Sequence, residues 1–257
     1  MVAAYRYLRM LEDGEVARIT LARPPLNILT IEMMEELGRA LRSVAEGPGV
    51  RALVLGAEGK AFSAGVAVED HLGERVKPML EAFHQIFRHL HSLDLPTVAV
   101  VQGPALGGGA ELATFCDLVI ASETATLGQP EIKVGVFPPI AALWYPRRVG
   151  EARALQLLLS GEVISAREAE RIGLVDRVVP PEELEQAVAA ALAKFTDGSA
   201  VVLRLIKRAV REGRGRDFEA ALTALEGLYH TELMQTEDAE EGLRAFVEKR
   251  PPVWKHR

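Results

Sequence analysis

The first half of the chain alternates between short apolar runs and longer segments with apolar residues at helical spacing. The apolar runs have the length of buried strands, and Thr30 is placed to cap the first helical segment. Because strands that alternate with helices build layered α/β structures, this alternation predicts an α/β core. The predicted strands are residues 52–55, 97–101 and 118–121, and the predicted helices are residues 31–44, 76–92 and 107–115, the last opened by a glycine loop.

Residues 5–22 predict a β-hairpin at the start of this core. Asp13-Gly14 is a strong signal for a tight turn. After the turn, apolar residues alternate with polar ones from Ala17 to Leu21, which is typical of a strand with one buried face.

The chain becomes largely helical from about residue 150. Ser165 and Glu168 form a capping box that predicts a helix start, and residues 174–179 predict a last short strand. No low-complexity linker interrupts the chain. We therefore expect a core over residues 1–195 and a helical region over residues 196–257, with helices near 199–212, 217–235 and 237–249.

Composition excludes several classes of function. The 257 residues are 49% hydrophobic and carry a net charge of −6, which predicts a large core and argues against a general nucleic-acid binder. Cys116 is the only cysteine, so no intramolecular disulfide can form, which suits a cytoplasmic protein. No apolar stretch approaches the roughly 20 residues that cross a bilayer, so we expect no membrane span.

The segment from Gly107 to Glu131 carries the clearest chemical signal. A glycine triplet opens an apolar helix, where free N–H groups and the helix dipole favour negative charge. Such a helix start can hold an oxyanion. Taken alone, the triplet is also compatible with a plain strand-to-helix turn.

Two glutamates follow the triplet. Glu111 lies among apolar residues in the first helical turn, where burial would raise its pKa into the range useful for general acid–base catalysis. The alternative is a glutamate that merely favours the helix dipole. Glu131 follows Gln129-Pro130, a rigid turn that would hold its carboxyl in place, although many such glutamates are simply exposed.

A second glycine loop, residues 59–66, follows the predicted strand 52–55. Ligands of α/β proteins commonly bind at the ends of such strands. A backbone N–H from this loop could complete an oxyanion hole with the glycine triplet.

Together these residues resemble the enoyl-CoA hydratase/isomerase family, also called the crotonase family, over almost the whole chain. The resemblance implies an α/β fold built as a spiral of ββα units, with a C-terminal helical region that builds homotrimers or dimers of trimers. Four ordered motifs carry it: residues 59–66 (GKAFSAGV), 103–112 (GPALGGGAEL), 128–136 (GQPEIKVGV) and 239–252 (AEEGLRAFVEKRPP).

The resemblance implies a role for each matching residue. The N–H groups of Val66 and Gly108 would form the oxyanion hole, and Glu111 and Glu131 match the two catalytic glutamates of the hydratases. The substrate would be an acyl-CoA thioester, with no metal and no cofactor, because coenzyme A is part of the substrate. The implied substrate-binding residues are Lys60, Ser63, Ala64, Val68, Gly107 and Phe137.

The chain also departs from the common family pattern. Ala67 stands where aspartate is frequent, and the bulky segment 137–145 replaces a glycine-rich stretch. In these features the chain resembles the cyclohexa-1,5-dienecarbonyl-CoA hydratases. An ordinary enoyl-CoA hydratase is the first hypothesis, and a cyclic dienoyl-CoA hydratase, an enoyl-CoA isomerase and an inactive acyl-CoA-binding scaffold are its alternatives. The resemblance also implies that the basic pair Lys249-Arg250 reaches coenzyme A from a neighbouring subunit.

Overall fold

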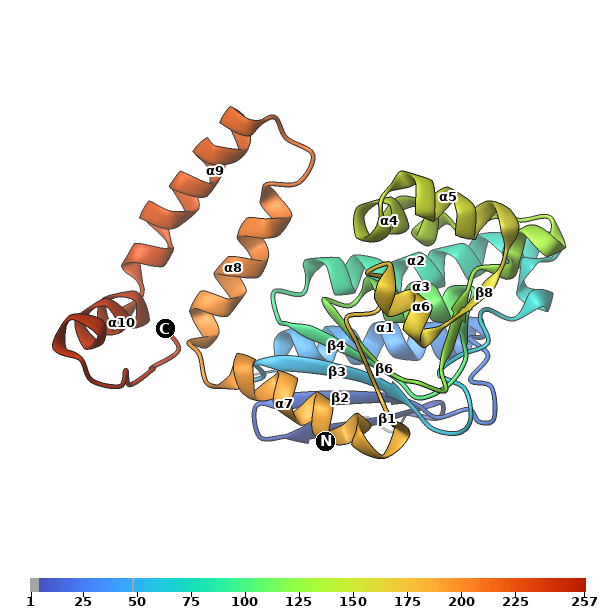
Figure 1. Cartoon of the computed structure of the whole chain (residues 1–257), viewed down its shortest axis with the longest axis horizontal. Helices are drawn as coiled ribbons and strands as arrows, with labels where there is room; N and C mark the ends of the chain where they lie inside the picture. The colour runs from blue at the N-terminus through green and yellow to red at the C-terminus, as the bar shows by residue number, and fades with distance from the viewer. Residues whose placement is uncertain (1–4, 48) are drawn as a thin grey trace. The chain divides into compact units, whose positions relative to one another are not determined.

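The computed structural model describes residues 5–47 and 49–257, which form two compact units (Figure 1). The first unit contains the described residues up to Leu93 and residues 97–189. The second unit contains residues 94–96 and 190–257.

A six-stranded sheet forms the centre of the first unit. The first two strands form the predicted antiparallel hairpin, and each later strand pairs in parallel with its neighbour. Every residue of the fourth strand is buried, as expected for a strand covered on both faces. In sheet order the strands are β1 (Leu8–Asp13), β2 (Val16–Leu21), β3 (Ala52–Ala57), β4 (Thr97–Val101), β6 (Leu118–Ser122) and β9 (Arg177–Val179).

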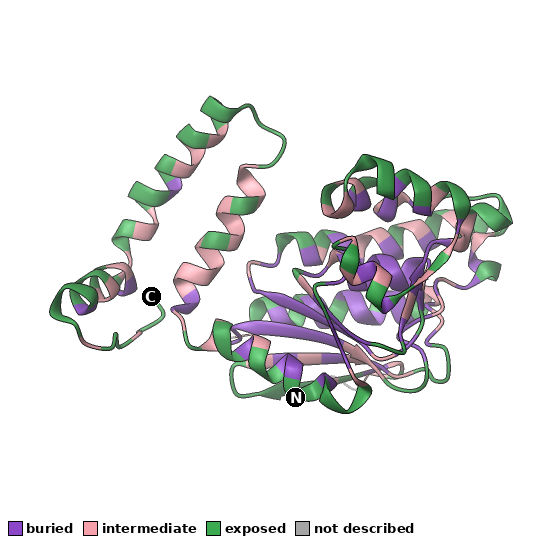
Figure 2. Cartoon of the chain, viewed as in Figure 1, coloured by how far each residue is buried: buried purple, intermediate pink, exposed green. Residues whose placement is uncertain are grey.

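Helices α1 (Ile31–Glu46) and α2 (Val76–Ser92) pack against each other and turn one buried stripe each inward (Figure 2). The Thr30 hydroxyl accepts a hydrogen bond from Met33 N at 3.4 Å, which confirms the predicted cap. Two 3₁₀ turns, Val68–His71 and Gly73–Arg75, precede α2.

A small second sheet joins the two segments that carry the glycine triplet and Glu131. Strands β5 (Ala105–Leu106) and β7 (Thr126–Gly128) are parallel, and β7 is antiparallel to β8 (Val163–Ser165). Parallel strands end at the same edge, so Gly107 comes directly beside Gly128, and Gly107 N donates to Gly128 O at 2.9 Å. This sheet therefore brings helix α3 (Gly108–Phe115) next to the 3₁₀ turn Pro130–Val134, which contains Glu131.

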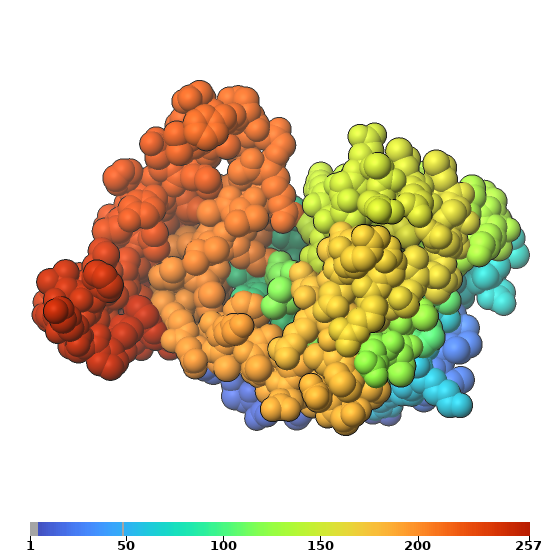
Figure 3. Space-filling model, in the orientation of Figure 1, coloured from blue at the N-terminus to red at the C-terminus, as the bar shows by residue number. Residues whose placement is uncertain are grey.

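Helices α4 (Pro139–Val149), α5 (Glu151–Ser160) and α6 (Ala166–Arg171) form one continuous outer layer of the first unit in the space-filling view (Figure 3). The Ser165 hydroxyl accepts from Glu168 N at 3.2 Å, so the predicted cap of α6 is confirmed. Helix α4 was not expected from the sequence.

The predicted strand 174–179 is wrong over its first half, because only Arg177–Val179 pair in the sheet. Leu174 N and Val175 N both donate to Ala169 O, so these residues close the end of α6 instead. After β9, the 3₁₀ turn Pro181–Glu183 leads into α7 (Leu184–Thr196).

The second unit contains the remaining helices, which lie within a few residues of their predicted ranges: α8 (Ala200–Glu212), α9 (Phe218–Thr231) and α10 (Glu237–Glu248). The predicted helix 217–235 ends at Thr231 and is followed by the 3₁₀ turn Leu233–Gln235. Within the described ranges, no helix is long and apolar enough to cross a membrane.

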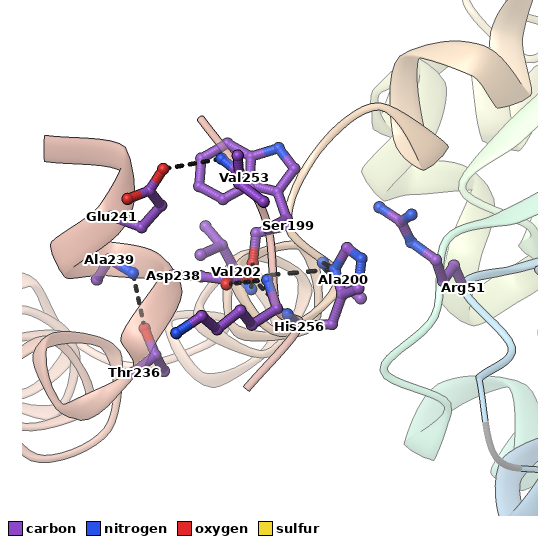
Figure 4. Close-up of polar contacts among 12 residues, drawn as sticks. Arg51, Ser199, Ala200, Val202, Thr236, Asp238, Ala239, Glu241, Val253 and His256 are labelled. Atoms are coloured by element: carbon purple, nitrogen blue, oxygen red, sulfur yellow. Dashed lines mark hydrogen bonds and ion pairs between the residues drawn. The ribbon is translucent and has the colours of Figure 1, made fainter. Parts of the chain in front are cut away.

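A buried carboxyl, Asp238, anchors the C-terminal tail within the second unit (Figure 4). It accepts hydrogen bonds from the Ser199 hydroxyl at 2.5 Å, from Lys255 N at 2.7 Å and from His256 N at 3.0 Å. Burial alone would raise the pKa of Asp238, but these three hydrogen bonds outweigh it and hold the pKa below its ordinary value.

Candidate active site

Gly107 sets the distance between helix α3 and Glu131. Its backbone has φ 52° and ψ −128°, a conformation that side chains with a Cβ rarely adopt. A Cβ at this position would lie 2.6 Å from Oε1 of Glu131. Only glycine therefore allows both this turn and the close approach of the Glu131 carboxyl to the start of α3.

The two glycine loops bring the residues of the expected oxyanion hole into contact. A Cβ on Gly108 would lie 2.8 Å from Cγ2 of Val66, so the two residues are immediate neighbours. Among residues 5–47 and 49–257, neither Val66 N nor Gly108 N donates to a protein acceptor. Two such neighbouring amides are the donors that a developing oxyanion requires.

The loop that carries Val66 is held in place from both sides. Leu29 N donates to Gly65 O at 2.9 Å, and Ala67 N donates to Leu29 O at 3.0 Å. These two bonds fix the peptide groups on either side of Val66. Its own N–H is left for another acceptor.

Glu111 is a deeply buried carboxyl. Its side chain lies in α3 with an exposure of 2%, and its Oε1 accepts from Ala141 N of α4 at 2.6 Å. Burial raises the pKa of Glu111 to about 8, against the opposing hydrogen bond from Ala141 and with the help of the negative charge of Glu131. This shift favours the protonated carboxyl, which is the form that can donate a proton.

Glu131 is half-buried, and burial also raises the pKa of its carboxyl. It lies against Gly107 and its charge acts on Glu111, so the two predicted glutamates share one site. Two carboxyls in unequal surroundings can divide the roles of acid and base.

The other predicted substrate-binding residues fall into two groups. Ser63 is fully buried, and its hydroxyl donates to Asn27 O at 2.8 Å and accepts from Gly65 N at 3.2 Å, so it supports the loop. Ala64 is half-buried. Lys60, Val68 and Phe137 are exposed and open to a ligand.

Arg250, the second member of the C-terminal basic pair, is engaged within its own chain. Its guanidinium contacts Glu241 at 2.6 Å and Glu248 at 2.7 Å. The hydrogen bond with Arg250 lowers the pKa of Glu241 to about 2. This arginine therefore braces the end of α10.

Several residues that shape the site were missed from the sequence. Asn27, at φ 48°, uses its side-chain amide to hold Glu58 O at 2.7 Å and Ala61 O at 2.9 Å, which braces the first glycine loop. A buried asparagine with positive φ is a recognised signal of a tight turn, and Pro24-Pro25 nearby pointed to one. Ala141 acts only through its backbone N–H, which no residue pattern reveals.

Comparison with known proteins shows the family to which the chain is related. Residues 12–257 match the family model described as enoyl-CoA hydratase/isomerase. The cyclohexa-1,5-dienecarbonyl-CoA hydratase of Thauera aromatica is 39% identical over 249 residues, covering 95% of each chain. A protein named probable enoyl-CoA hydratase from Rhizobium meliloti is 41% identical over 262 residues, covering 99% of this chain and 100% of its own.

Solved structures agree on the fold. The enoyl-CoA hydratase of Bacillus anthracis superimposes with a TM-score of 0.92 at 32% identity, covering 98% of this chain and 100% of the other. This likeness confirms the predicted crotonase-like α/β fold. Because the family model matches residues 12–257 and the fold is shared, the chain belongs to the enoyl-CoA hydratase/isomerase family.

Proposed function

We propose that the protein is an enoyl-CoA hydratase that adds water across the conjugated double bond of an enoyl-CoA thioester. One observation carries this proposal: a buried Glu111, whose pKa is raised by burial, shares a site with Glu131, beside the neighbouring amides of Val66 and Gly108. The relatives named as hydratases support the same reaction class.

The oxyanion hole would activate the substrate. The thioester oxygen would accept hydrogen bonds from Val66 N and Gly108 N, which draws electron density through the conjugated system away from the β-carbon. Developing negative charge on the oxygen would then be stabilised by two fixed donors rather than by mobile water.

The glutamates would move the protons. The oxygen of a water molecule would bond to the β-carbon while the Glu131 carboxylate takes one water proton. Glu111 would give its proton to the α-carbon as the enolate collapses, so one water is added in total. Proton exchange with solvent or between the carboxyls would restore the pair. Coenzyme A enters as part of the substrate, and the proposed steps use no metal or further cofactor.

A cyclic conjugated dienoyl-CoA is the second candidate substrate. It is favoured by the similarity to the Thauera aromatica protein and by the bulky segment 137–145, which the structure folds largely into α4. An acyl pocket beside this helix would have a different shape from one formed by a glycine-rich stretch.

A turnover assay separates these substrates. Crotonyl-CoA and cyclohexa-1,5-dienecarbonyl-CoA would be incubated together with the protein, and the masses of the products measured by mass spectrometry. Addition of one water to crotonyl-CoA supports the ordinary hydratase, and preference for the diene supports the cyclic alternative. A product of unchanged mass with a moved double bond would instead identify an isomerase, and inertness towards both would favour a scaffold.

We further propose that the protein assembles as a homotrimer or a dimer of trimers. The helices of the second unit expose many large apolar side chains, which monomeric soluble proteins seldom leave uncovered. Sedimentation equilibrium would test this, and a monomer at micromolar concentration would contradict it. These side chains are Ile206, Val210, Phe218, Leu222, Tyr229, Leu243, Phe246 and Val247.

A further inference from the structure

Tyr145 is a buried polar side chain that the proposed reaction does not use. It is 1% exposed, and burial raises its pKa, so the hydroxyl keeps its proton. The hydroxyl lies 2.8 Å from the Gln129 side-chain amide, and the side chain of Thr114 acts on its pKa in the direction opposite to burial. Thr114 lies in α3 with Glu111, and Gln129 lies two residues before Glu131. The Tyr145 hydroxyl therefore lies between the two segments that carry the glutamates.

The Gln129 amide links Tyr145 to Glu131. Gln129 is fully buried, and the far end of its amide lies 3.2 Å from each oxygen of the Glu131 carboxyl. A carboxylate can only accept hydrogen bonds, so the amide nitrogen must face Glu131. The amide oxygen then faces Tyr145 and accepts from its hydroxyl at 2.8 Å.

The inner face of α4 contacts both glutamate-bearing elements. Ala141, Trp144 and Tyr145 are the buried residues of this helix, and their spacing places them on one face. Ala141 N donates to Glu111, Trp144 Nε1 donates to Thr114 O at 2.9 Å, and Tyr145 contacts Gln129. One face of α4 thus contacts both segments that carry the glutamates and fixes the position of one carboxyl relative to the other.

We propose that Tyr145 is a positioning residue for Glu131, acting through Gln129. Its hydroxyl fixes the Gln129 amide with the nitrogen towards Glu131, which keeps that carboxyl charged and correctly oriented to accept the proton of water. This role rests on the proposed hydratase function.

Loss of the hydroxyl has a defined consequence. In Tyr145→Phe, the buried amide oxygen of Gln129 has no donor, so the amide keeps only its contact with Glu131 and is no longer held in place from the other side. The N–H groups then hold the Glu131 carboxylate less firmly, which makes its protonated form more favourable than in the wild type. Since Glu131 acts as the base, the variant loses activity at neutral pH and regains part of it as the pH rises.

The test compares Tyr145→Phe, Gln129→Met and the double variant in hydration of the substrate that the wild type prefers. For Tyr145→Phe we expect kcat to fall roughly tenfold, with KM changed by less than about twofold. We also expect the apparent pKa of the acid limb, in a plot of kcat against pH, to rise by about half to one pH unit. One unit corresponds to about 1.36 kcal/mol. The double variant should be no slower than Gln129→Met, because both residues act through one contact.

Matched measurements keep the result interpretable. Tyr7→Phe removes the hydroxyl of a half-buried tyrosine in the N-terminal segment and should behave as wild type. Thermal unfolding shows whether each variant is folded. An unchanged acid limb in folded Tyr145→Phe, or losses that add in the double variant, would overturn the proposal.

A binding measurement separates this proposal from the proposed function. The affinity for the unreactive butyryl-CoA is measured against pH by calorimetry, because the charge of Glu131 lies beside the bound acyl group. If the wild type hydrates no enoyl-CoA, the proposed function fails. Even then, if the affinity for butyryl-CoA changes with pH around a higher midpoint in Tyr145→Phe than in the wild type, the link between Tyr145 and Glu131 is supported. An identical midpoint in both proteins refutes that link.

Discussion

Gly107→Ala should nearly abolish activity while leaving the protein folded. The added Cβ would lie 2.6 Å from Oε1 of Glu131, whereas ordinary contacts begin at 3.4 Å. The Glu131 carboxyl must therefore retreat by about 1 Å, and a misplacement of this size can cost roughly 10²-fold in rate. We expect kcat to fall by about that factor, because Glu131 is displaced from the water it would activate.

The same substitution strains the backbone. Alanine at φ 52° and ψ −128° costs about 1–3 kcal/mol. For a chain of this size each kcal/mol lowers the melting temperature by about 2–4 °C, which predicts a fall of roughly 2–12 °C. Thermal unfolding by circular dichroism would measure it.

Gly150→Ala is the matched control. Gly150 also has a positive φ, at 79° with ψ 158°, but a Cβ there would meet nothing within 4 Å. It should therefore lose a comparable amount of stability and keep the wild-type kcat. Wild-type kcat in Gly107→Ala, or an equal loss of kcat in both variants, would refute the reasoning.

Three further predictions concern carboxyls. Glu111→Gln and Glu131→Gln should each lower kcat by about 10²–10⁴ while acyl-CoA affinity measured by calorimetry is retained. Burial raises the pKa of Glu111 from 4.5 to about 8, so the native chain binds a proton that the unfolded chain releases, and wild-type stability falls as the pH rises between these values. The free energy of unfolding of Glu111→Gln, relative to that of the wild type, should therefore increase with pH across that interval, by roughly a few kcal/mol in total. Urea unfolding at several pH values would measure it, and a difference that does not change with pH would contradict the prediction. Asp238→Asn should lose about 1–3 kcal/mol at neutral pH, because buried donors lose their charged acceptor. Since the pKa of Asp238 is lowered from 3.8, this difference should begin to shrink as the pH falls below 3.8 and should vanish only when the wild-type carboxyl itself protonates at lower pH.

Local signals in the sequence predicted most of the fold. The Asp13-Gly14 turn, the Thr30 and Ser165 caps and the helix over residues 76–92 each depend on neighbouring residues, and all are present. The small sheet was only partly foreseeable. Its strands are two or three residues long, so they are too short to show a periodic pattern.

Helix α4 shows why other parts could not be read from the sequence. Pro146 stands inside the helix, which normally argues against a continuous helix, although the proline at the first position is compatible with a helix start. Tertiary contacts of Ala141, Trp144 and Tyr145 outweigh this local preference. The partners of these three residues lie 16 or more positions away in sequence, and no local pattern reveals such pairs.

The candidate site was predicted in its chemistry but not in its detail. Glycine at 107 and a carboxyl at 111 are unusual at a buried helix start, so they were visible as functional residues. The unequal environments of Glu111 and Glu131 arise from α4 and Gly107, and only the fold reveals them.

Incorporation of labelled water tests the proposed hydration at the step that forms the new bond. The wild type and Glu131→Gln would be incubated with crotonyl-CoA in H₂¹⁸O, and the product analysed by mass spectrometry. The wild type should place one ¹⁸O on the β-carbon, and the variant should do so at least about a hundredfold more slowly, which is roughly the contribution of a general base. Equal incorporation by both proteins, or a product whose label is not on the β-carbon, would contradict the account.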